Sequence, residues 1–523
     1  MTELSTPSTR VWVRWSKIAL GCVLTISVIY FIITTIHWPL VGDASLIHYI
    51  SFLMDHGMAP YRDLGDMNMP GSYLIEWSVV HTLGGGALAW RIFDFSLAAA
   101  ALVGMICIAL PYDWFAGLFA GVLFMLAHGR DGIHQSGQRD LTLAVLLIVA
   151  YAFLFYGMRR NHWWATGLFG LCAGIGATIK PTAIPLGILL LLLAVLPLKK
   201  NHWRIAPHLY AGIAGLMLPI AVVGVFLVQQ QALSAFLHNL RTVVPYYASL
   251  GHLPFSTMIV HSVSPFVLLV ILWIAFLGIR LFSAKQESAK WDQWEHLTLW
   301  IGLLFSFASY VAQHKDHPYH RYPFLAILLA IMSIDVLLGM QRRGLLRLTA
   351  VFSLALGALF LAPRSAYLAG TYDWRTLEFM DMLEADINAL GGQQLSGHIQ
   401  CIDWISGCNT TLYRMKLVQQ TGMLADFLIL GPDSAKAVQE ARAKFWQQIH
   451  QEPPKVIIVT SFQHLNGSDN FEKMDLWPEL QTYLASDYML VAQRRPPDPV
   501  RWWNHAQKWA AYRIYVLKNS GVK

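Results

Sequence analysis

Long apolar runs separated by short polar connections make up the larger, N-terminal part of the chain. A membrane-spanning helix needs about 20 predominantly apolar residues. The segment 71–83 is apolar but short, and it runs into three glycines, so we expect a re-entrant or interfacial helix packed against protein. The longer runs predict about eleven spanning helices, near residues 18–36, 90–110, 113–127, 140–158, 163–179, 182–198, 208–228, 259–281, 296–312, 322–340 and 345–362.

The polar connections between these runs differ in charge. Cytoplasmic loops of membrane proteins carry an excess of Lys and Arg, so basic connections predict which ends of the helices face the cytoplasm. With this rule the N-terminus is cytoplasmic and the C-terminus lies outside. The first apolar run has no small-residue cleavage site after it, so we expect an uncleaved helix and not a removed signal peptide. The basic connections contain Arg159 and Arg160; Lys199, Lys200 and Arg204; Arg280, Lys285 and Lys290; and Arg342, Arg343 and Arg347.

From about residue 363 the pattern changes to that of a soluble domain. "WRTLEFMDMLEADINAL" and "SAKAVQEARAKFWQQI" have the apolar spacing of amphipathic helices. "HIQCID", "KVIIVTS", "YMLVAQR" and "YRIYVLK" have the composition of strands. The sequence therefore predicts a transmembrane domain at 1–362, with a first outer loop at 37–70, and a soluble extracytoplasmic α/β domain at 363–523. In an oxidising compartment Cys401 and Cys408 could form a disulfide, while two unrelated buried thiols are the alternative.

Composition excludes a soluble globular protein. Of the 523 residues, 55% are hydrophobic and only 13% are charged, whereas a soluble domain carries about 25% charged residues. The five cysteines are too few for a disulfide scaffold. The chain is therefore a polytopic α-helical membrane protein.

Ionisable residues that the basic connections do not explain gather in the predicted outer connections. Because a charge at membrane depth costs about 2.5–3.5 kcal/mol on insertion scales, such residues are functional candidates. Lys180 stands out as a lone cation, followed by a proline, between two apolar helices. Cations can hold an anionic headgroup, and an acid can deprotonate or orient an incoming hydroxyl or amine. This combination is typical of transfer from a lipid-linked phosphate donor.

Each candidate also has a purely structural interpretation. Asp43 could cap the helix that starts after it, and Asp63 and Asp66 could be turn residues. Arg139 with Asp140, and Arg321, could be interfacial anchors. His314, His317 and His320 are the candidates for a metal site, although "HKDHPYH" lacks the spacing of a strong motif.

The order of these motifs resembles the GT-C superfamily of membrane glycosyltransferases. The resemblance is to the bacterial relatives of the protein O-mannosyltransferases and of the lipid A aminoarabinose transferase, in glycosyltransferase family 39 and its neighbours. It covers roughly residues 1–340, with Met69 where a proline is usual, and the outer α/β domain fits the family plan. The matching segments are "GDASLIHYI", "PYRDLGDMNMPGSYLIEW", "GQRDLTLAVLLIVAYAFLF", "GIGATIKPTAIPL" and "HRYPFLAILLAI".

The resemblance implies an inverting transfer of a sugar from a polyprenyl-phosphate donor to an extracytoplasmic glycan, lipid or protein acceptor. It implies the inner (cytoplasmic) membrane of a bacterium, with membrane lipids but no nucleic acid as partners. No cofactor is required, although some relatives use a divalent metal at the first-loop acids. The implied catalytic residues are Asp43 and Asp66; the donor phosphate is held by Lys180, Arg321, Arg139 and His320; and the acceptor or sugar is bound by Arg62, Tyr61 and Asp140.

Two other classes of membrane protein also combine many apolar helices with ionisable residues. A transporter or flippase for a lipid-linked or anionic saccharide would keep ionisable residues near the bilayer midplane, often at broken helices in paired halves. An O-antigen ligase or polymerase would carry its key arginines in a large late outer loop, whereas the segment 229–258 is modest and contains only Arg241. Both fit the motif order less well than a glycosyltransferase does.

Overall fold

The computed structural model describes residues 7–282, 292–315, 317–342, 344–371, 376–463, 468–496 and 510–518. The basic residues Lys285, Lys290 and Arg343 of the predicted cytoplasmic connections lie outside these ranges. The chain divides into two compact units, each built from several segments. The first unit comprises residues 1–38, 90–223 and 251–372, and the second comprises 39–89, 224–250 and 373–523.

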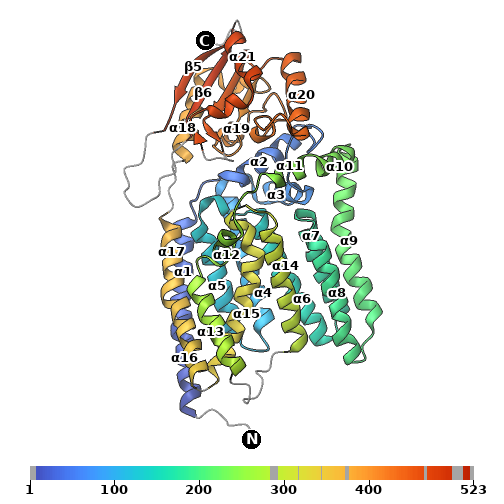
Figure 1. The fold of residues 1–523 in the computed structure, drawn as a ribbon, viewed down its shortest axis with the longest axis vertical. Helices are drawn as coiled ribbons and strands as arrows, with labels where there is room; N and C mark the ends of the chain where they lie inside the picture. Colours follow the sequence, from blue (N-terminus) through green and yellow to red (C-terminus); the bar gives the residue numbers. More distant parts are fainter. Residues whose placement is uncertain are drawn as a thin grey trace. The chain divides into compact units, whose positions relative to one another are not determined.

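The first unit is a bundle of helices that run alongside one another, for example α1 with α17 and α5 with α15 (Figure 1). α15 is the most buried of its long apolar helices, with 94% of its apolar window buried inside the protein. The ends of α4 and α9 extend into the second unit. The helices are α1 (Pro7–Thr35), α4 (Ala87–Ala109), α5 (Trp114–Asp131), α6 (Arg139–Arg160), α7 (Trp163–Ile179), α8 (Ala183–Lys200), α9 (Ile205–Gln229), α12 (Phe255–Val263), α13 (Val267–Phe282), α14 (Gln293–Val311), α15 (Tyr322–Met340), α16 (Leu345–Ala355) and α17 (Ala362–Gly370), with short helical turns η1 (Ile133–Gln135), η2 (Pro318–Arg321) and η3 (Leu356–Leu361).

The apolar helices agree with the predicted spans in position. Within the described ranges, seven helices are long and apolar enough to cross a membrane, or eight if the bent pair α12 and α13 forms one span. That pair bends by 88°. Helices α5, α7 and α14 occupy predicted positions but are not among the seven. The multi-span character is therefore present in the structure, while the number of eleven crossings stays a prediction.

The second unit contains a four-stranded mixed sheet in the order β1-β2-β6-β5. Strand β1 runs parallel to β2, and the other neighbours are antiparallel. Every residue of β1 and β2 is buried, as expected for strands covered on both faces. The strands are β1 (Ile399–Ile402), β2 (Val456–Thr460), β5 (Tyr488–Arg494) and β6 (Tyr512–Leu517), with a small ribbon of β3 (Phe462–Gln463) and β4 (Ser468–Asp469); the helices of this part are α18 (Thr376–Ala389), α19 (Cys408–Met415), α20 (Lys436–Gln451) and α21 (Pro478–Asp487), with turns η4 (Gly392–Leu395), η5 (Asp426–Leu428) and η6 (Glu472–Leu476).

The first outer loop belongs to this second unit. It folds into α2 (Gly42–Asp55) and the approach to α3 (Pro70–Leu83), and the unit also contains α10 (Leu233–Arg241) and α11 (Val243–Ser249). The backbone N–H of Gly65 donates to the carbonyl of Gly422 at 2.8 Å. A Cβ on Gly422 would lie 1.8 Å from the backbone oxygen of Asp63, so only glycine allows this close approach. The loop and the C-terminal segment thus form one packed body, and the domain boundary at residue 362 stays a prediction.

Candidate functional site

Asp43 lies in the first turn of α2, in the second unit. The helix begins at Gly42 and the capping position is occupied by Val41, so Asp43 is not the capping residue of the structural alternative. A carboxylate in a first turn is favoured by the partial positive charge of the helix N-terminus. The residue is half-buried. Its position suits a carboxylate that accepts a proton or a hydrogen bond from a bound acceptor.

The C-terminal segment holds α2 in place. The hydroxyls of Ser45 and Thr410 lie 2.6 Å apart. Tyr49 donates its hydroxyl to the carbonyl of Leu417 at 2.9 Å and accepts from the backbone N–H of Gln419 at 3.0 Å. Because both partners are buried, these bonds are shielded from water and fix the rotation of the helix that carries Asp43.

Asp66 and Tyr61 shape the loop before α3. The buried carboxylate of Asp66 accepts hydrogen bonds from the Met67 N–H at 2.8 Å, from Asn68 Nδ2 at 2.7 Å and from the Tyr73 hydroxyl at 2.7 Å. Tyr61 is buried, and its hydroxyl donates to the carbonyl of Asn68. Burial raises the pKa of Tyr61 well above its usual value. These contacts account for both residues as loop anchors, and their roles in catalysis and sugar binding stay predictions.

Arg62 belongs to the same loop and is largely exposed. Its guanidinium pairs with Asp63 at 2.7 Å and donates to the carbonyl of Gln230 at 2.9 Å. Burial alone would raise the pKa of Asp63, but hydrogen bonds from Arg62 and from the Ala59 N–H outweigh it and lower that pKa. Arg62 therefore connects the loop to the segment before α10, and sugar binding by Arg62 stays a prediction.

Lys180 is the centre of a group of cations in the first unit. Pro181 disfavours the helical conformation at Lys180, which is extended (φ −146°, ψ 108°), so α7 ends at Ile179. The Lys180 Nζ donates to Asp140 Oδ1 at 2.7 Å and to Gln313 Oε1 at 3.2 Å. The predicted sugar ligand Asp140 is thus the ion-pair partner of the predicted phosphate ligand. We call Arg139, Lys180 and Lys315, together with the neighbouring imidazole rings of His317 and His320, the cation cluster.

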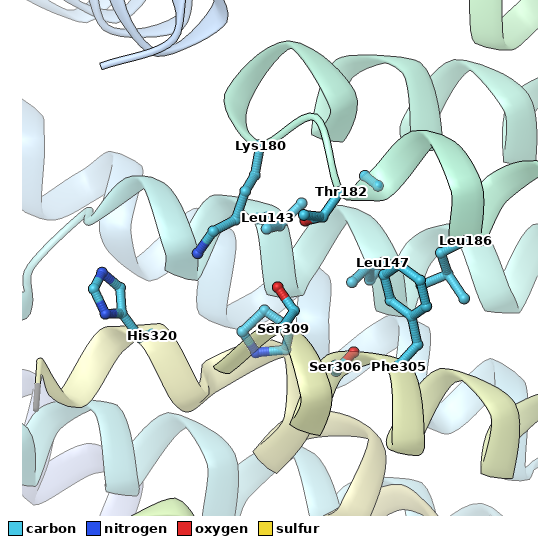
Figure 2. Close-up of a pocket in the computed structure, with 11 residues that line it drawn as sticks. Leu143, Leu147, Lys180, Thr182, Leu186, Phe305, Ser306, Ser309 and His320 are labelled. Carbon is cyan, nitrogen blue, oxygen red and sulfur yellow. The ribbon is translucent and has the colours of Figure 1, made fainter. Parts of the chain in front are cut away.

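An apolar hollow begins at the cation cluster. It has a volume of about 20 Å³, which is room for about one water molecule. Figure 2 shows Lys180, Ser309 and His320 at one end and Leu147, Leu186 and Phe305 at the other. The leucines come from α6 and α8 and the phenylalanine from α14. The lining, with Lys180 at one end and aliphatic side chains at the other, has the polarity that suits an anionic head and a hydrocarbon tail.

Lys315 was not among the candidates predicted from the sequence. Its pKa reflects the positive charges of the cluster. Burial, together with the positive charges of Arg139 and Lys180, lowers the pKa of Lys315 to about 7. The loop that carries it is packed closely, because a Cβ on Gly251 would lie 2.4 Å from the carbonyl oxygen of Gln313. An anion bound among these positive charges would offset their mutual repulsion, so the cluster is suited to binding an anion. In the described part of the chain, no group of three or more His, Cys, Asp or Glu residues is arranged to hold a metal ion.

Arg321 does not line this hollow. Its Nη2 donates to both carboxylate oxygens of Asp131 at 2.7 Å, and its Nη1 donates to the carbonyl of His261 at 3.1 Å. The side chain is buried. Arg321 would have to release Asp131 before it could bind a donor phosphate. Its role in phosphate binding therefore stays a prediction.

A buried ionic network inside the first unit was missed by sequence reasoning. Arg91 and Asp94 form an ion pair in α4, and both are only 1% exposed. Asp94 Oδ1 accepts from His128 Nε2 at 2.9 Å, and His128 Nδ1 lies 3.2 Å from the Tyr322 hydroxyl, which hydrogen-bonds Asp131. The available signal was the Arg and Asp three residues apart within an otherwise apolar run, which places both on one helix face.

Comparison with known proteins identifies the fold. No family model matches the sequence, and no curated protein sequence matches it. ArnT from Cupriavidus metallidurans in the apo state is similar, with a TM-score of 0.56 and 13% identity over 94% of this chain and 97% of that one. ArnT bound to undecaprenyl phosphate matches with a TM-score of 0.54 and 12% identity over the same shares of the two chains.

A second type of neighbour has the same fold. The archaeal oligosaccharyltransferase AglB from Archaeoglobus fulgidus, in complex with an inhibitory peptide and a dolichol-phosphate, matches with a TM-score of 0.51 and 11% identity. The match covers 85% of this chain and 70% of that chain. ArnT and AglB are GT-C membrane glycosyltransferases, so the resemblance predicted from the sequence is confirmed at the level of the fold. With its apolar helices, the chain is a multi-pass membrane protein.

Proposed function

We propose that the protein is an inverting glycosyltransferase that moves a sugar from a polyprenyl-phosphate donor to an extracytoplasmic glycan, lipid or protein acceptor. The observation that carries the proposal is the cation cluster at one end of the apolar hollow, with Lys180 as a member of both. We expect an isoprenoid tail to move the aliphatic side chains apart at one end of the hollow, while its phosphate meets the cations at the other. The GT-C fold supports the same class of reaction, since the ArnT structure contains bound undecaprenyl phosphate and the AglB structure is a complex with a dolichol-phosphate.

The chemistry is a single displacement. The acceptor oxygen or nitrogen forms a bond to the anomeric carbon while the bond from that carbon to the phosphate oxygen breaks. Asp43 takes the acceptor proton or orients the acceptor. Lys180, Arg139 and Lys315 stabilise the charge that develops on the leaving phosphate, which is often the largest catalytic contribution. Asp140 and Gln313 hold the Lys180 ammonium in position before the donor arrives.

The proposal includes a bacterial inner membrane, with the C-terminal segment outside the cytoplasm. The Cys401–Cys408 disulfide supports this orientation, because such bonds persist in oxidising compartments. The bond joins the end of β1 to the start of α19. No cofactor is part of the proposal, and metal dependence is left to experiment.

A transporter of lipid-linked or anionic saccharides is the second candidate. The observation that favours it is the buried pair of Arg91 and Asp94 within α4, since ionisable residues inside spanning helices often mark transport pathways. In a transporter, the sugar would cross the membrane still attached to its carrier. The two candidates therefore differ in whether the bond between sugar and phosphate is broken.

The decisive experiment incubates the purified protein with a panel of polyprenyl-phosphate sugars, with and without envelope lipid, glycan and peptide acceptors. We expect release of free polyprenyl phosphate, dependent on acceptor, from at least one donor. The same donors in sealed vesicles measure transport. Translocation of intact donor without release of polyprenyl phosphate would reject the transferase in favour of the transporter.

Lys180→Gln is expected to weaken donor binding about 10- to 150-fold, the equivalent of a charged hydrogen bond of about 1.5–3 kcal/mol. The substitution also leaves Asp140 without its cation, so the double variant Lys180→Gln/Asp140→Asn separates the two effects. Equilibrium binding of a labelled donor measures both variants. If the double variant binds as tightly as the wild type, Lys180 does not contact the phosphate. Lys199→Gln, at the far end of α8, is the control.

Donor affinity is expected to fall as the pH rises above about 7. A phosphodiester donor keeps one negative charge throughout, so the titrating groups belong to the protein. Lys315 is protonated below its pKa of about 7, and bound donor raises that pKa. Affinity is therefore highest below about pH 7 and declines between the pKa values of the free and bound states. Binding measured from about pH 6 to 9 should lose this decline in Lys315→Gln. An unchanged profile would show that Lys315 is not the titrating group.

A further inference from the structure

A long groove on the first unit lies far along the bundle from the cation cluster. It has a volume of about 1170 Å³ and is lined by α1, the start of α5 and the end of α15. His320 of the cluster precedes α15, and Met340 at the end of α15 lines the groove. The 19 residues of α15 span about 28 Å. The two sites are therefore separate.

One end of the groove is basic and the rest is apolar. Arg14 and Lys17 lie one helical turn apart on α1 and line the same end, beside Gln341. Ile18, Ile26 and Leu118 continue the lining along the helices. From Arg14 to Ile26 the helix rises by about 18 Å, a length that accommodates much of a fatty acyl chain.

The two cations are not equivalent. Lys17 forms an ion pair with Asp113, and Asp113 caps α5 by accepting from the Phe115 N–H at 3.1 Å. Arg14 is exposed and forms no ion pair with another residue of the described ranges. Within the described ranges no acid neutralises the charge of Arg14, whose planar guanidinium can bind a phosphate through two parallel hydrogen bonds.

We propose that this groove binds an anionic glycerophospholipid of the surrounding bilayer. The phosphate lies on Arg14, with Lys17 nearby, and one acyl chain lies along α1 between Ile18 and Ile26. Trp114, which is 52% exposed at the start of α5, supplies the indole that membrane proteins place at headgroup level. Basic pockets between membrane helices bind anionic headgroups in this way. The positive charge of Arg14 favours a lipid with one net negative charge over a zwitterionic one.

Occupancy would tie α1 to the bundle. Many side chains along α1 are exposed, including Ile26 and Ile33 at 65% each. A lipid that contacts α1, α5 and α15 together adds apolar contacts between helices whose direct packing leaves a groove. This inference does not depend on the proposed enzymatic function.

The test uses the full-length protein, delipidated in detergent and titrated with phosphatidylglycerol or phosphatidylcholine of identical acyl chains. Native mass spectrometry counts the retained lipids, and thermal unfolding reports stabilisation. We expect preferential retention of phosphatidylglycerol and a higher unfolding temperature with it. Arg14→Gln should weaken that binding about tenfold and remove the preference. Lys200→Gln, a cation at the end of α8 outside the groove, is the matched control.

A second variant tests the apolar part. Cys22→Phe places a ring in the groove without changing the charge, so it should weaken phosphatidylglycerol binding while Arg14 is intact. Equal retention of both lipids by the wild type, or equal loss in Arg14→Gln and Lys200→Gln, would overturn the proposal. So would tighter binding of undecaprenyl phosphate than of phosphatidylglycerol, because the groove would then be a site for a prenyl lipid.

Discussion

Asp43→Asn is expected to lower the turnover number by about 10²–10⁴-fold, the range that a positioned general base contributes. Asparagine keeps the size of the side chain and can still orient an acceptor through its amide, but it cannot take a proton. Donor affinity should change little, because the phosphate is proposed to bind the cation cluster. The measurement is the release of polyprenyl phosphate at saturating donor and acceptor, with donor binding determined separately.

Two further variants make this result specific. Asp55→Asn changes an exposed acid at the other end of α2, where it accepts from Trp77 Nε1 at 2.9 Å, and should turn over normally. Asp43→Glu keeps a carboxylate and should recover part of the activity. If Asp43→Asn is folded, binds donor and turns over at the wild-type rate, Asp43 is not the catalytic acid residue. The glycosyltransferase proposal itself would survive that outcome.

The parts of the fold that the sequence predicted depend on local patterns. An apolar run such as 140–158 signals a helix by itself, and α6 occupies that position. The strand segments around residues 456–460 and 512–517 were likewise found from their composition. The grouping of the first outer loop with the C-terminal segment depends instead on contacts across hundreds of residues, such as Gly65 with Gly422. No local pattern encodes such a contact.

The residues of the candidate site also fall into two groups: those with a local sequence signal and those that depend on contacts between distant segments. Lys180 was identifiable because a lone cation before a proline is unusual between apolar helices, and the structure joins it to Asp140 and Gln313. The involvement of Gln313 and Lys315 could not be predicted, since both sit in a short loop whose partners come from other helices. Tyr61 and Asp66 show a different case. Both stand at motif positions that suggest ligand binding, yet their hydrogen bonds inside the loop are enough to explain why these residue types occur there.

Arg91→Met is expected to destabilise the protein by about 3–5 kcal/mol, the cost of breaking a buried ion pair from one side. The Arg91 side chain donates to the carbonyl of Thr35 at 3.1 Å and to the Ser136 hydroxyl at 3.0 Å, in addition to its pair with Asp94. Its guanidinium also lies 4.7 Å from the Trp38 ring centroid. One side chain thus connects α1, α4 and the loop before α6, so its loss affects three parts of the bundle.

The double variant Arg91→Met/Asp94→Leu separates two effects: the loss of the Arg91 contacts, and the cost of leaving the Asp94 carboxylate buried without its cation. Methionine alone leaves the Asp94 carboxylate buried, with the His128 ring and the Gly137 N–H as its remaining partners in the described part of the chain. Replacing both charged residues removes that penalty, so the double variant should be more stable than Arg91→Met despite carrying one more substitution. Unfolding in detergent, followed by circular dichroism, measures all three proteins. A double variant no more stable than Arg91→Met would mean that Arg91 acts through its contacts with Thr35, Ser136 and Trp38, and that the charge of Asp94 is tolerated without it.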